Sequence, residues 1–384
     1  MCRILVVATV SGAGMGPYVS EIANTFSATD DVYFIFSDAD LFYKRNIKEE
    51  LHKKSIFYSK KSSRIHQVVT KIFDERRGLY QAILEECKRL DIDIVHFING
   101  CRNEYIYRKL KQNGIKILTT VHDLHPHESS SRFFKRLREK FYWHKSFKRI
   151  CESRYLVTNS MIQYQEIKDK FKDKYVFSHE FPSLVTKEIQ EGIEKSKELE
   201  NIIKPYILFF GRIEAYKGLN ILCDAFVNSP ELNKNYNLVI AGRGKLNYEI
   251  DANLDSIVFI NRYIKDTEIA QLYKNAAAVV YPYISATQSG VLSLAFYYQV
   301  PVLTSDIPYF KAVINDYCTG YIFKNGDSED LASKLKQLLR SNNDAIKKNQ
   351  ADYYSKFYQS SAIREQLLEI YASIYMSDNN ISNG

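Results

Sequence analysis

Short apolar runs alternate with amphipathic stretches along this chain, and the alternation predicts two successive series of buried strands and helices. In the first half, a glycine-rich turn follows the first apolar run, and a helix is expected to begin near Pro17. Residues 44–77 form a basic segment with interleaved Phe and Tyr. The predicted helices of this half also include 65–90, 103–112 and 161–171. Its predicted strands are 3–10, 32–36, 92–98, 115–121, 154–158 and 175–177.

The second half repeats the pattern. Its predicted strands are 206–210, 238–241, 257–260, 278–281, 300–304 and 321–323, and helices at 328–340 and 345–375 follow. Two βα series of similar size predict the α/β fold class, with two doubly wound Rossmann-like domains facing across a cleft. The expected divisions are a first domain at 1–182, a linker at 183–204, a second domain at 205–350, a last helix at 351–376 and a disordered polar tail at 377–384.

The formal charge of +8 is unevenly distributed. Residues 1–182 hold 32 Lys and Arg against 22 Asp and Glu, a net charge of +10, whereas residues 183–384 hold 21 against 23, a net charge of −2. This asymmetry indicates an anionic partner for the first half, such as a membrane surface, a nucleic acid or an acidic polymer. The alternative is a solvated basic face without a partner.

The chain contains no long uncharged apolar run, so no transmembrane helix is expected, and residues 1–10 are interpreted as a strand rather than a signal peptide. The six cysteines are scattered and include no Cys-x-x-Cys pair. Their pattern favours reduced thiols in a cytosol and argues against structural zinc.

Residues 132–150 combine eight Lys and Arg with one acid, Glu139, and with several aromatic residues. On a helix the apolar side chains gather on one broad face: Phe133, Phe134, Leu137, Phe141 and Phe147. This pattern favours an interfacial helix that lies on anionic lipid, which would place the protein peripherally on the cytoplasmic face of the cell membrane. The alternative is a helix packed on the domain with a cationic outer face.

A polar cluster with three histidines, His122, His125 and His127, follows the predicted strand 115–121. Because α/β sheets keep their sites at the carboxyl ends of strands, we expect this cluster to contact a substrate. A metal site from the three histidines is the alternative, although their spacing matches neither a zinc helix nor a zinc finger. The Asp-x-Asp sequence at residues 38–40 is interpreted as a loop.

The stretch 207–218 combines an apolar run, a glycine turn at Gly211 and two cations, Arg212 and Lys217. It predicts a buried strand that leads through a turn into a helix beginning near Gly218. Glycine lets the backbone approach an anion, a helix N-terminus offers unpaired N–H groups, and cations neutralise charge. Together these features predict a phosphate site, with an ordinary strand-to-helix turn as the alternative.

Two later turns extend this prediction. The sequence Gly-Arg-Gly at 242–244 ends a predicted strand, where the backbone can approach a ligand or simply turn. After strand 278–281 a helix is expected to begin about Ser289, and the N–H groups of residues 290–292 would face an anion. The alternative is a helix that Ser289 caps.

The order of these motifs resembles the retaining nucleotide-sugar glycosyltransferases of the GT-B fold, glycosyltransferase family 4, of the bacterial polysaccharide type. The motifs are Phe-Gly-Arg-Ile-x-x-x-Lys-Gly from position 210, Gly-x-Gly from 242, Asn-Arg-Tyr-Ile from 261, Ala-Thr-Gln-Ser-Gly-Val from 286 and Val-Pro-Val-Leu-Thr-Ser-Asp from 300. The resemblance covers the second half strongly, and the first half only at the glycine loop and near His122. It implies a last helix that crosses back to the first domain.

The resemblance also implies roles for individual residues. Arg212 and Lys217 would hold the donor diphosphate and stabilise it during catalysis, and His122 would lie near the reacting sugar. The implied donor-binding positions are Gly14, Gly16, Gly211, Gly242, Arg243, Tyr263, Thr287, Gln288, Ser289, Gly290, Val291 and Leu292. The co-substrate would be a nucleotide-sugar, with a UDP-sugar expected, and neither a metal nor another cofactor is implied.

This chain departs from the family pattern at Ala286 and Leu294, where the family carries two glutamates. Thr287 and Gln288 could replace one of the lost sugar contacts. The expected function is transfer of a hexose, with retention, from a UDP- or GDP-sugar to a saccharide or lipid-linked saccharide during capsule, exopolysaccharide or O-antigen synthesis. The alternatives are a catalytically inactive GT-B binding subunit and a nucleic-acid-binding protein. The missing dinucleotide fingerprint argues against a dehydrogenase.

Overall fold

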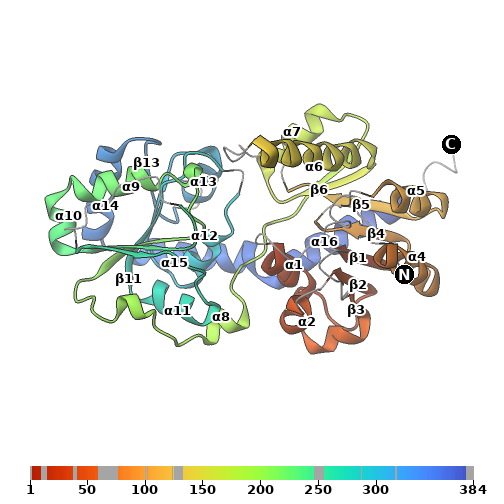
Figure 1. The fold of residues 1–384 in the computed structure, drawn as a ribbon, viewed down its shortest axis with the longest axis horizontal. Coiled ribbons are helices and arrows are strands. Elements are labelled where there is room, and N and C mark those ends of the chain that lie inside the picture. Colours follow the sequence, from red (N-terminus) through yellow and green to blue (C-terminus); the bar gives the residue numbers. More distant parts are fainter. Residues whose placement is uncertain are drawn as a thin grey trace. The chain divides into compact units, whose positions relative to one another are not determined.

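The computed structural model describes residues 2–9, 15–37, 41–58, 77–99, 101, 103–122, 124, 133–245, 255–286, 288–315 and 318–377, with backbone only at 77 and 133–142. The chain divides into two compact units (Figure 1). One comprises Met1–Pro182 with Ser360–Gly384, and the other comprises Ser183–Gln359.

The described part of the first unit contains a parallel sheet of seven strands in the order β3-β2-β1-β4-β5-β6-β7. The strands are β1 (Ile4–Ala8), β2 (Val32–Ser37), β3 (Ser55–Tyr58), β4 (Ile94–Phe97), β5 (Lys116–Thr120), β6 (Tyr155–Thr158) and β7 (Tyr175–Ser178). The strand order reverses direction at β1, and in open α/β sheets ligands bind at the carboxyl edge near such a point.

The helices of the first unit cover both faces of this sheet. They are α1 (Met15–Asn24), α2 (Phe42–Asn46), the 3-10 turn η1 (Glu49–Lys54), α4 (Arg77–Leu90), α5 (Glu104–Gln112), α6 (Phe133–Glu152), α7 (Met161–Lys170) and α16 (Ser360–Met376). Alternate residues of β1 enter different cores: Ile4 and Val6 pack with α1 and α16, whereas Leu5 and Val7 pack with α4 and α5. Burial on both faces explains the unbroken apolar run of this strand.

Two elements of the first unit differ from their prediction. Strand β3 lies inside the basic segment 44–77, where no strand was predicted; its four residues are half-buried, its apolar run is only three residues long, 56–58, and two lysines precede it at positions 53 and 54. Helix 65–90 is described only from Arg77 onward, and the earlier part of the prediction lies outside the described residues.

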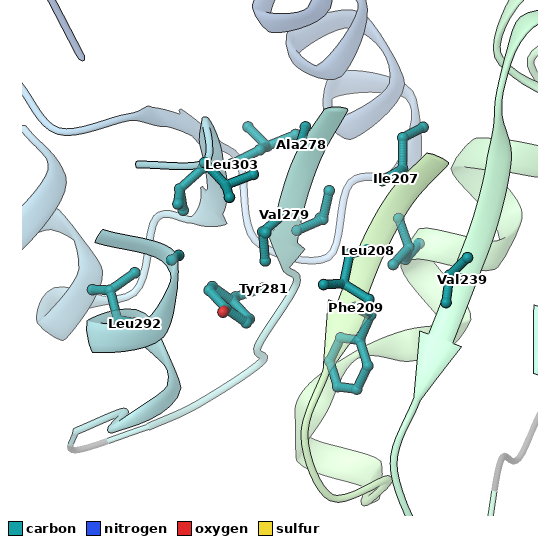
Figure 2. Close-up of a cluster of buried hydrophobic side chains, with 14 of the residues drawn as sticks. Ile207, Leu208, Phe209, Val239, Ala278, Val279, Tyr281, Leu292 and Leu303 are labelled. Atoms are coloured by element: carbon teal, nitrogen blue, oxygen red, sulfur yellow. The ribbon is translucent and has the colours of Figure 1, made fainter. Parts of the chain in front are cut away.

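The described part of the second unit contains a parallel sheet of six strands in the order β10-β9-β8-β11-β12-β13. The strands are β8 (Tyr206–Phe210), β9 (Asn237–Ala241), β10 (Ile257–Ile260), β11 (Ala276–Tyr281), β12 (Val302–Ser305) and β13 (Tyr321–Phe323). Apolar residues of β8, β9 and β11 fill the centre of its core, as Figure 2 shows for Leu208, Val239 and Val279. The structure therefore confirms the predicted α/β class, with two Rossmann-like parallel sheets.

Helices lie on both sides of the second sheet (Figure 1). They are α8 (Lys187–Glu191), α9 (Leu219–Val227), α10 (Pro230–Asn235), α11 (Asp266–Lys274), α12 (Val291–Tyr297), α13 (Pro308–Ile314), α14 (Ser328–Arg340) and α15 (Asp344–Tyr353), with 3-10 turns η2 (Lys197–Leu199) and η3 (Ala215–Lys217). Helices α9, α10 and α14 pack together, and α8 packs on α11. The expected linker 183–204 thus belongs to this unit. An ion pair between Glu198 of this segment and Arg262 (2.9 Å) attaches it to the rest of the unit.

The predicted helical region 345–375 is interrupted. Helix α15 passes into a π-helical turn, η4 (Tyr354–Tyr358), and the chain is extended at Gln359 before α16 begins. Helix α16 packs on the first unit, where the Tyr371 hydroxyl lies 2.9 Å from Nδ1 of His96. Ser377, expected in a disordered tail, hydrogen-bonds Tyr155 (2.6 Å), and residues 378–384 lie outside the described residues.

Candidate functional site

The turns predicted to hold phosphate lie together at one edge of the second sheet. Because β8, β9 and β11 are parallel neighbours, their carboxyl ends meet at this edge. A Cβ atom placed on Gly211, which follows β8, would lie 4.0 Å from Cγ1 of Val291, the first residue of α12. The glycine turn and the helix start, 80 positions apart in the chain, are therefore adjacent in space.

Gly242 has a packing role at this edge. A Cβ atom there would lie 1.8 Å from the Gly211 carbonyl oxygen, and the Gly242 φ of 152° is one that residues with a side chain rarely adopt. The Gly211 N–H donates to the carbonyl of Ala241 (3.0 Å). Glycine at 242 thus lets the turns after β8 and β9 touch through their backbones.

Lys217 is held by aromatic rings rather than by an acid. Its ammonium lies 3.6 Å from the ring centroid of Tyr283 and 4.8 Å from that of Tyr216. Among the residues that the structure describes, no carboxylate lies within ion-pair distance of it. Burial lowers the pKa of Lys217, while Tyr216 and Glu214 act in the opposite direction. A half-buried cation of this kind is available to an incoming anion.

Backbone contacts fix the loop of Lys217 against the loop that follows β11. The N–H of Ile284 donates to the carbonyl of Tyr216 (2.8 Å). Gly218, with a φ of 64°, approaches the Pro282 carbonyl so closely that a Cβ atom would lie 1.9 Å from its oxygen. The loop carrying the cation and the loop leading to α12 therefore form one packed layer.

The other predicted polar side chains are exposed. Arg212 pairs with Glu214 (3.0 Å) and is 62% exposed, so this pair contributes little stability. Arg243 is exposed, and Tyr263, predicted to bind the donor, is 70% exposed, with its hydroxyl 3.4 Å from Asp266. These three side chains can reach a ligand only by extending over the surface.

At the start of α12 one of the three predicted N–H donors is engaged, and the alternative of a Ser289 cap is wrong. The N–H of Leu292 is not free for an anion, because it donates to the carbonyl of Ser289 (3.3 Å). Ser289 makes no side-chain cap; its hydroxyl donates to the Tyr283 hydroxyl (3.4 Å). Gly290 directly precedes the helix, and within the described residues the buried Oε1 of Gln288 has no partner. Thr287 lies outside the described residues.

The two positions that lack the family's glutamates have different surroundings. Leu294 is 1% exposed and belongs to the core of the second unit, whereas Ala286 is half-buried beside that core. Helix α12 therefore turns position 294 inward. An acid at this position would be buried in the core.

In the first unit, His122 lies at the carboxyl end of β5. Its Nε2–H donates to the Ile98 carbonyl (2.8 Å), and its ring meets Tyr18 edge to face at 5.0 Å. The buried side chain of Gln163 accepts from the Leu124 N–H (3.0 Å) and donates to the His122 carbonyl (2.8 Å). The position of His122 is thus set from three sides.

A buried polar network beside His122 was not predicted from the sequence. The Tyr18 hydroxyl donates to Asn159 (2.8 Å), whose amide donates to the carbonyl of His179 (3.2 Å). His96 lies between Thr120 (2.8 Å) and Tyr371. Burial lowers the pKa of His96 to about 3 and that of His179 to about 4. The sequence feature that could have predicted this network is the position of Asn159 directly after a strand.

Several predicted positions of the first unit cannot be assigned to this site. Gly16 is buried in the first turn of α1. Gly14, the Asp-x-Asp sequence at 38–40, His125 and His127 lie outside the described residues. In the described part of the chain, no group of three His, Cys, Asp or Glu side chains is placed to hold a metal ion.

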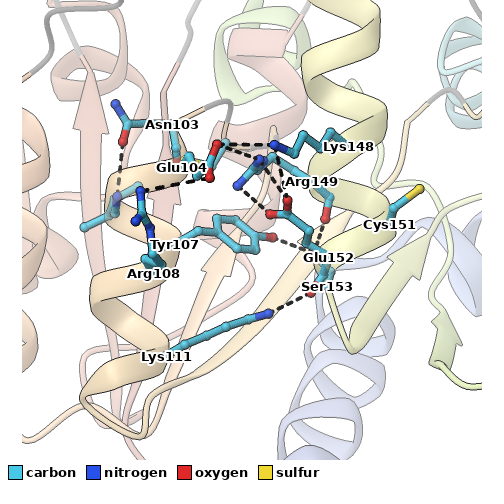
Figure 3. A network of polar contacts seen from close by, with 12 residues as sticks. Asn103, Glu104, Tyr107, Arg108, Lys111, Lys148, Arg149, Cys151, Glu152 and Ser153 are labelled. Carbon is cyan, nitrogen blue, oxygen red and sulfur yellow. Dashed lines mark hydrogen bonds and ion pairs between the residues drawn. The ribbon is translucent and has the colours of Figure 1, made fainter.

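Helix α6 is anchored at its C-terminal end by a charged network (Figure 3). Arg149 is 3% exposed and pairs with Glu152 (2.5 Å) and Glu104 (3.6 Å). The prediction that Phe147 faces lipid is wrong, because Phe147 packs on a core cluster of its own unit and against Phe171. The side chains of the other four predicted lipid-facing residues lie outside what the structure describes. None of the described helices is both long and apolar enough to span a membrane.

Residues 190–356 match the family model described as glycosyl transferases group 1. The second unit is a group 1 glycosyltransferase domain. The chain is 26% identical over 333 residues to the O-antigen chain mannosyltransferase RfbU of Salmonella typhimurium, covering 83% of this chain and 85% of that relative. It is 27% identical over 183 residues to a phosphatidyl-myo-inositol mannosyltransferase of Mycobacterium leprae, covering 46% of this chain and only 48% of that relative.

Solved structures confirm the predicted GT-B fold of the chain. A sucrose-phosphate synthase from Thermosynechococcus elongatus superposes with a TM-score of 0.67 at 17% identity, covering 98% of this chain and all of that one. HepE from Anabaena, solved with UDP and glucose, superposes with a TM-score of 0.66 at 14% identity, covering 97% of this chain and all of that one. At such identities the likeness concerns the fold.

Proposed function

We propose that this protein transfers a hexose from a nucleoside-diphosphate sugar, with UDP-sugar the first candidate, to a saccharide or lipid-linked saccharide acceptor in cell-surface polysaccharide synthesis. The observation that carries the proposal is the Lys217 ammonium, which is half-buried beside two rings and, within the described residues, has no acid partner. The relatives support the reaction class, since RfbU is a mannosyltransferase of O-antigen chains.

Electrostatic catalysis fits this arrangement. When the bond between sugar and diphosphate breaks, negative charge grows on the departing diphosphate, and a cation fixed beforehand stabilises it. Lys217 supplies that charge from inside the fold, and Arg212 can add a second charge from the surface. The N–H groups of Gly290 and Val291 lie at the adjoining helix start, where the helix dipole favours an anion. The acceptor hydroxyl would attack the anomeric carbon on the face that the diphosphate leaves and pass its proton to the departing diphosphate, so the anomeric configuration is retained.

The proposed reaction needs no metal ion, because side-chain cations and the start of α12 neutralise the charge of the diphosphate. His122 is proposed to lie beside the reacting sugar, and its fixed orientation suits this role. The Nε2–H donates to a backbone carbonyl, so in the neutral ring Nδ1 is the acceptor atom.

Release of free nucleotide from a panel of UDP- and GDP-sugars, with glycan acceptors, tests the proposal. Lys217→Met keeps most of the side-chain length and removes the charge, and we expect turnover to fall about 10²- to 10³-fold. Lys234→Met, which alters an exposed lysine of α10, is the matched control. Turnover of Lys217→Met within twofold of the control would refute the role of Lys217.

A catalytically inactive binding subunit is the second candidate, because position 294 is buried in the core and position 286 carries no acid. Tight donor binding without nucleotide release from any sugar nucleotide would favour it.

We also propose that the basic first unit lies peripherally on the anionic cytoplasmic face of the cell membrane. The support is the net charge of +10 over residues 1–182 and the basic segment 132–150. The anchored end of α6 would hold that segment in a fixed position on the unit.

A further inference from the structure

Tyr283 occupies a central position in the loop between β11 and α12. Its ring is fully buried and packs against Tyr281 (5.8 Å between centroids) and Phe310 (5.3 Å). Its carbonyl accepts a hydrogen bond from the hydroxyl of Ser305 (2.5 Å). The ring and the backbone of this residue are therefore both fixed by the core of the unit.

The face of this ring receives the Lys217 ammonium at 3.6 Å from the centroid. A cation within about 6 Å of an aromatic face is attracted by the ring quadrupole, and the attraction strengthens when water is excluded. The other groups that act on the ammonium are Tyr216, Glu214 and Arg212. Of these, Glu214 and Arg212 already pair with each other.

The hydroxyl at the far end of the same ring accepts from Ser289 (3.4 Å), the residue before Gly290 and the start of α12. A second hydroxyl, that of Tyr309, donates to the Ser289 carbonyl (3.4 Å). The Tyr283 side chain thus contacts the Lys217 ammonium through its ring face and the turn at the start of α12 through its hydroxyl.

We propose that Tyr283 is a positioning residue that holds the Lys217 ammonium and the Ser289 turn at a fixed separation, so that both meet one diphosphate group. The inference rests on the proposed function for the ligand, but the contact between ring and ammonium is testable without it. Tyr283 itself does not touch the reacting atoms.

The test uses the full chain with three replacements of Tyr283. Tyr283→Phe removes only the hydroxyl. A 3,4,5-trifluorophenylalanine at the same position keeps the ring's shape and weakens its quadrupole, and Tyr283→Leu removes the ring. Phe226→Leu is the matched control, because it truncates another fully buried ring of the same core, whereas the ring contacts of Tyr283 are with Tyr216, Tyr281 and Phe310.

The first readout is the rate at which acetic anhydride acetylates Lys217, measured by mass spectrometry at a pH where the ammonium predominates. Weakening the ring's attraction favours the neutral, reactive amine. We expect the trifluoro and Leu variants to react about 2- to 30-fold faster, the range that a cation–π attraction corresponds to. Tyr283→Phe and Phe226→Leu should react at the rate of the unsubstituted protein.

The second readout is the affinity for UDP by calorimetry. The trifluoro and Leu variants should bind UDP several-fold more weakly, and Tyr283→Phe should weaken binding less, through the Ser289 turn alone. Unchanged acetylation in the trifluoro variant overturns the inference, as does altered acetylation with unchanged UDP affinity. If the unsubstituted protein binds neither UDP nor GDP, the proposed function fails instead, and acetylation still decides whether the ring holds the ammonium.

Discussion

Replacing Gly218 by alanine should reveal how tightly the two loops of the candidate site are packed. Gly218 lies between η3 and α9 with a φ of 64°, in the left-handed region. A Cβ atom there would lie 1.9 Å from the carbonyl oxygen of Pro282 and 3.0 Å from its carbon. Real Cβ contacts begin at about 3.0 Å, so the loop that carries Tyr283 must move by about 1.1 Å.

Gly218→Ala should lower the stability for two reasons, and the two free-energy costs add. The left-handed backbone costs about 1–2 kcal/mol for a residue with a Cβ atom. Forcing packed atoms apart costs about 1–3 kcal/mol more. Gly326→Ala is the control for the first cost, because Gly326 has a φ of 82° and nothing within 4 Å of a Cβ atom. The difference between the two variants isolates the contact with Pro282.

Hydrogen exchange measured by mass spectrometry gives the free energy of opening for peptides that cover β8 and β11. We expect Gly218→Ala to lower that free energy by about 1–3 kcal/mol more than Gly326→Ala does, the cost of overpacking. Equal losses in the two variants would refute the close approach of Gly218 to Pro282.

Three further predictions concern the first unit. The unfolded chain binds protons at His96 and His179 below about pH 6.5, whereas the folded pKa values are about 3 and 4, so each histidine should lower the stability by about 2 kcal/mol as the pH falls from 7 to 5. Burial raises the pKa of Glu21 to about 7, which acts in the opposite direction over this range, so the histidine effect is measured as the difference between the unsubstituted protein and His96→Asn. In urea unfolding followed by Trp143 fluorescence, the loss of stability from pH 7 to 5 should be about 2 kcal/mol smaller in His96→Asn, and equal pH dependence of the two proteins would contradict a buried neutral His96. Arg364→Ala breaks the ion pair that holds α16 to the buried Asp30 and should lower the free energy of unfolding by about 1.5–3 kcal/mol in the same urea assay. The control Arg340→Ala breaks a surface pair and should cost about 0–1 kcal/mol, and equal losses in the two variants would contradict the anchoring role of Arg364. The protein should bind phosphatidylglycerol vesicles at low salt, and each Arg→Glu change at Arg136 or Arg138 should weaken binding by about 1 kcal/mol or more; absence of binding in cosedimentation would contradict the membrane proposal.

Strands buried on both faces were the most predictable elements. The apolar run 206–210 is strand β8 to the residue, because its side chains enter the core on either side of the sheet. Strand β3 was missed because its apolar run is only three residues long and lies in a strongly basic segment. The aromatic stripe of 132–150 shows a related limit, since periodicity cannot tell a lipid-facing side chain from one that packs inward, as Phe147 does.

The candidate site likewise contains residues that local sequence predicts and residues that it does not. Gly211, Lys217 and the start of α12 were predicted because turn and helix-start chemistry is local in sequence. Tyr283 was not, because its role depends on a ring face meeting a lysine 66 positions earlier in the chain. The buried network of Asn159 and His179 likewise arises from tertiary contacts between separate strand ends.

Calorimetric titration with UDP and with GDP tests most directly whether the Lys217 ammonium receives a diphosphate. The account predicts that one of these nucleotides binds the unsubstituted protein and the Lys234→Met control alike. Lys217→Met should bind it about 10- to 100-fold more weakly, as expected for the loss of one charged hydrogen bond. Equal affinity of Lys217→Met and the control, with both folded, would contradict the account.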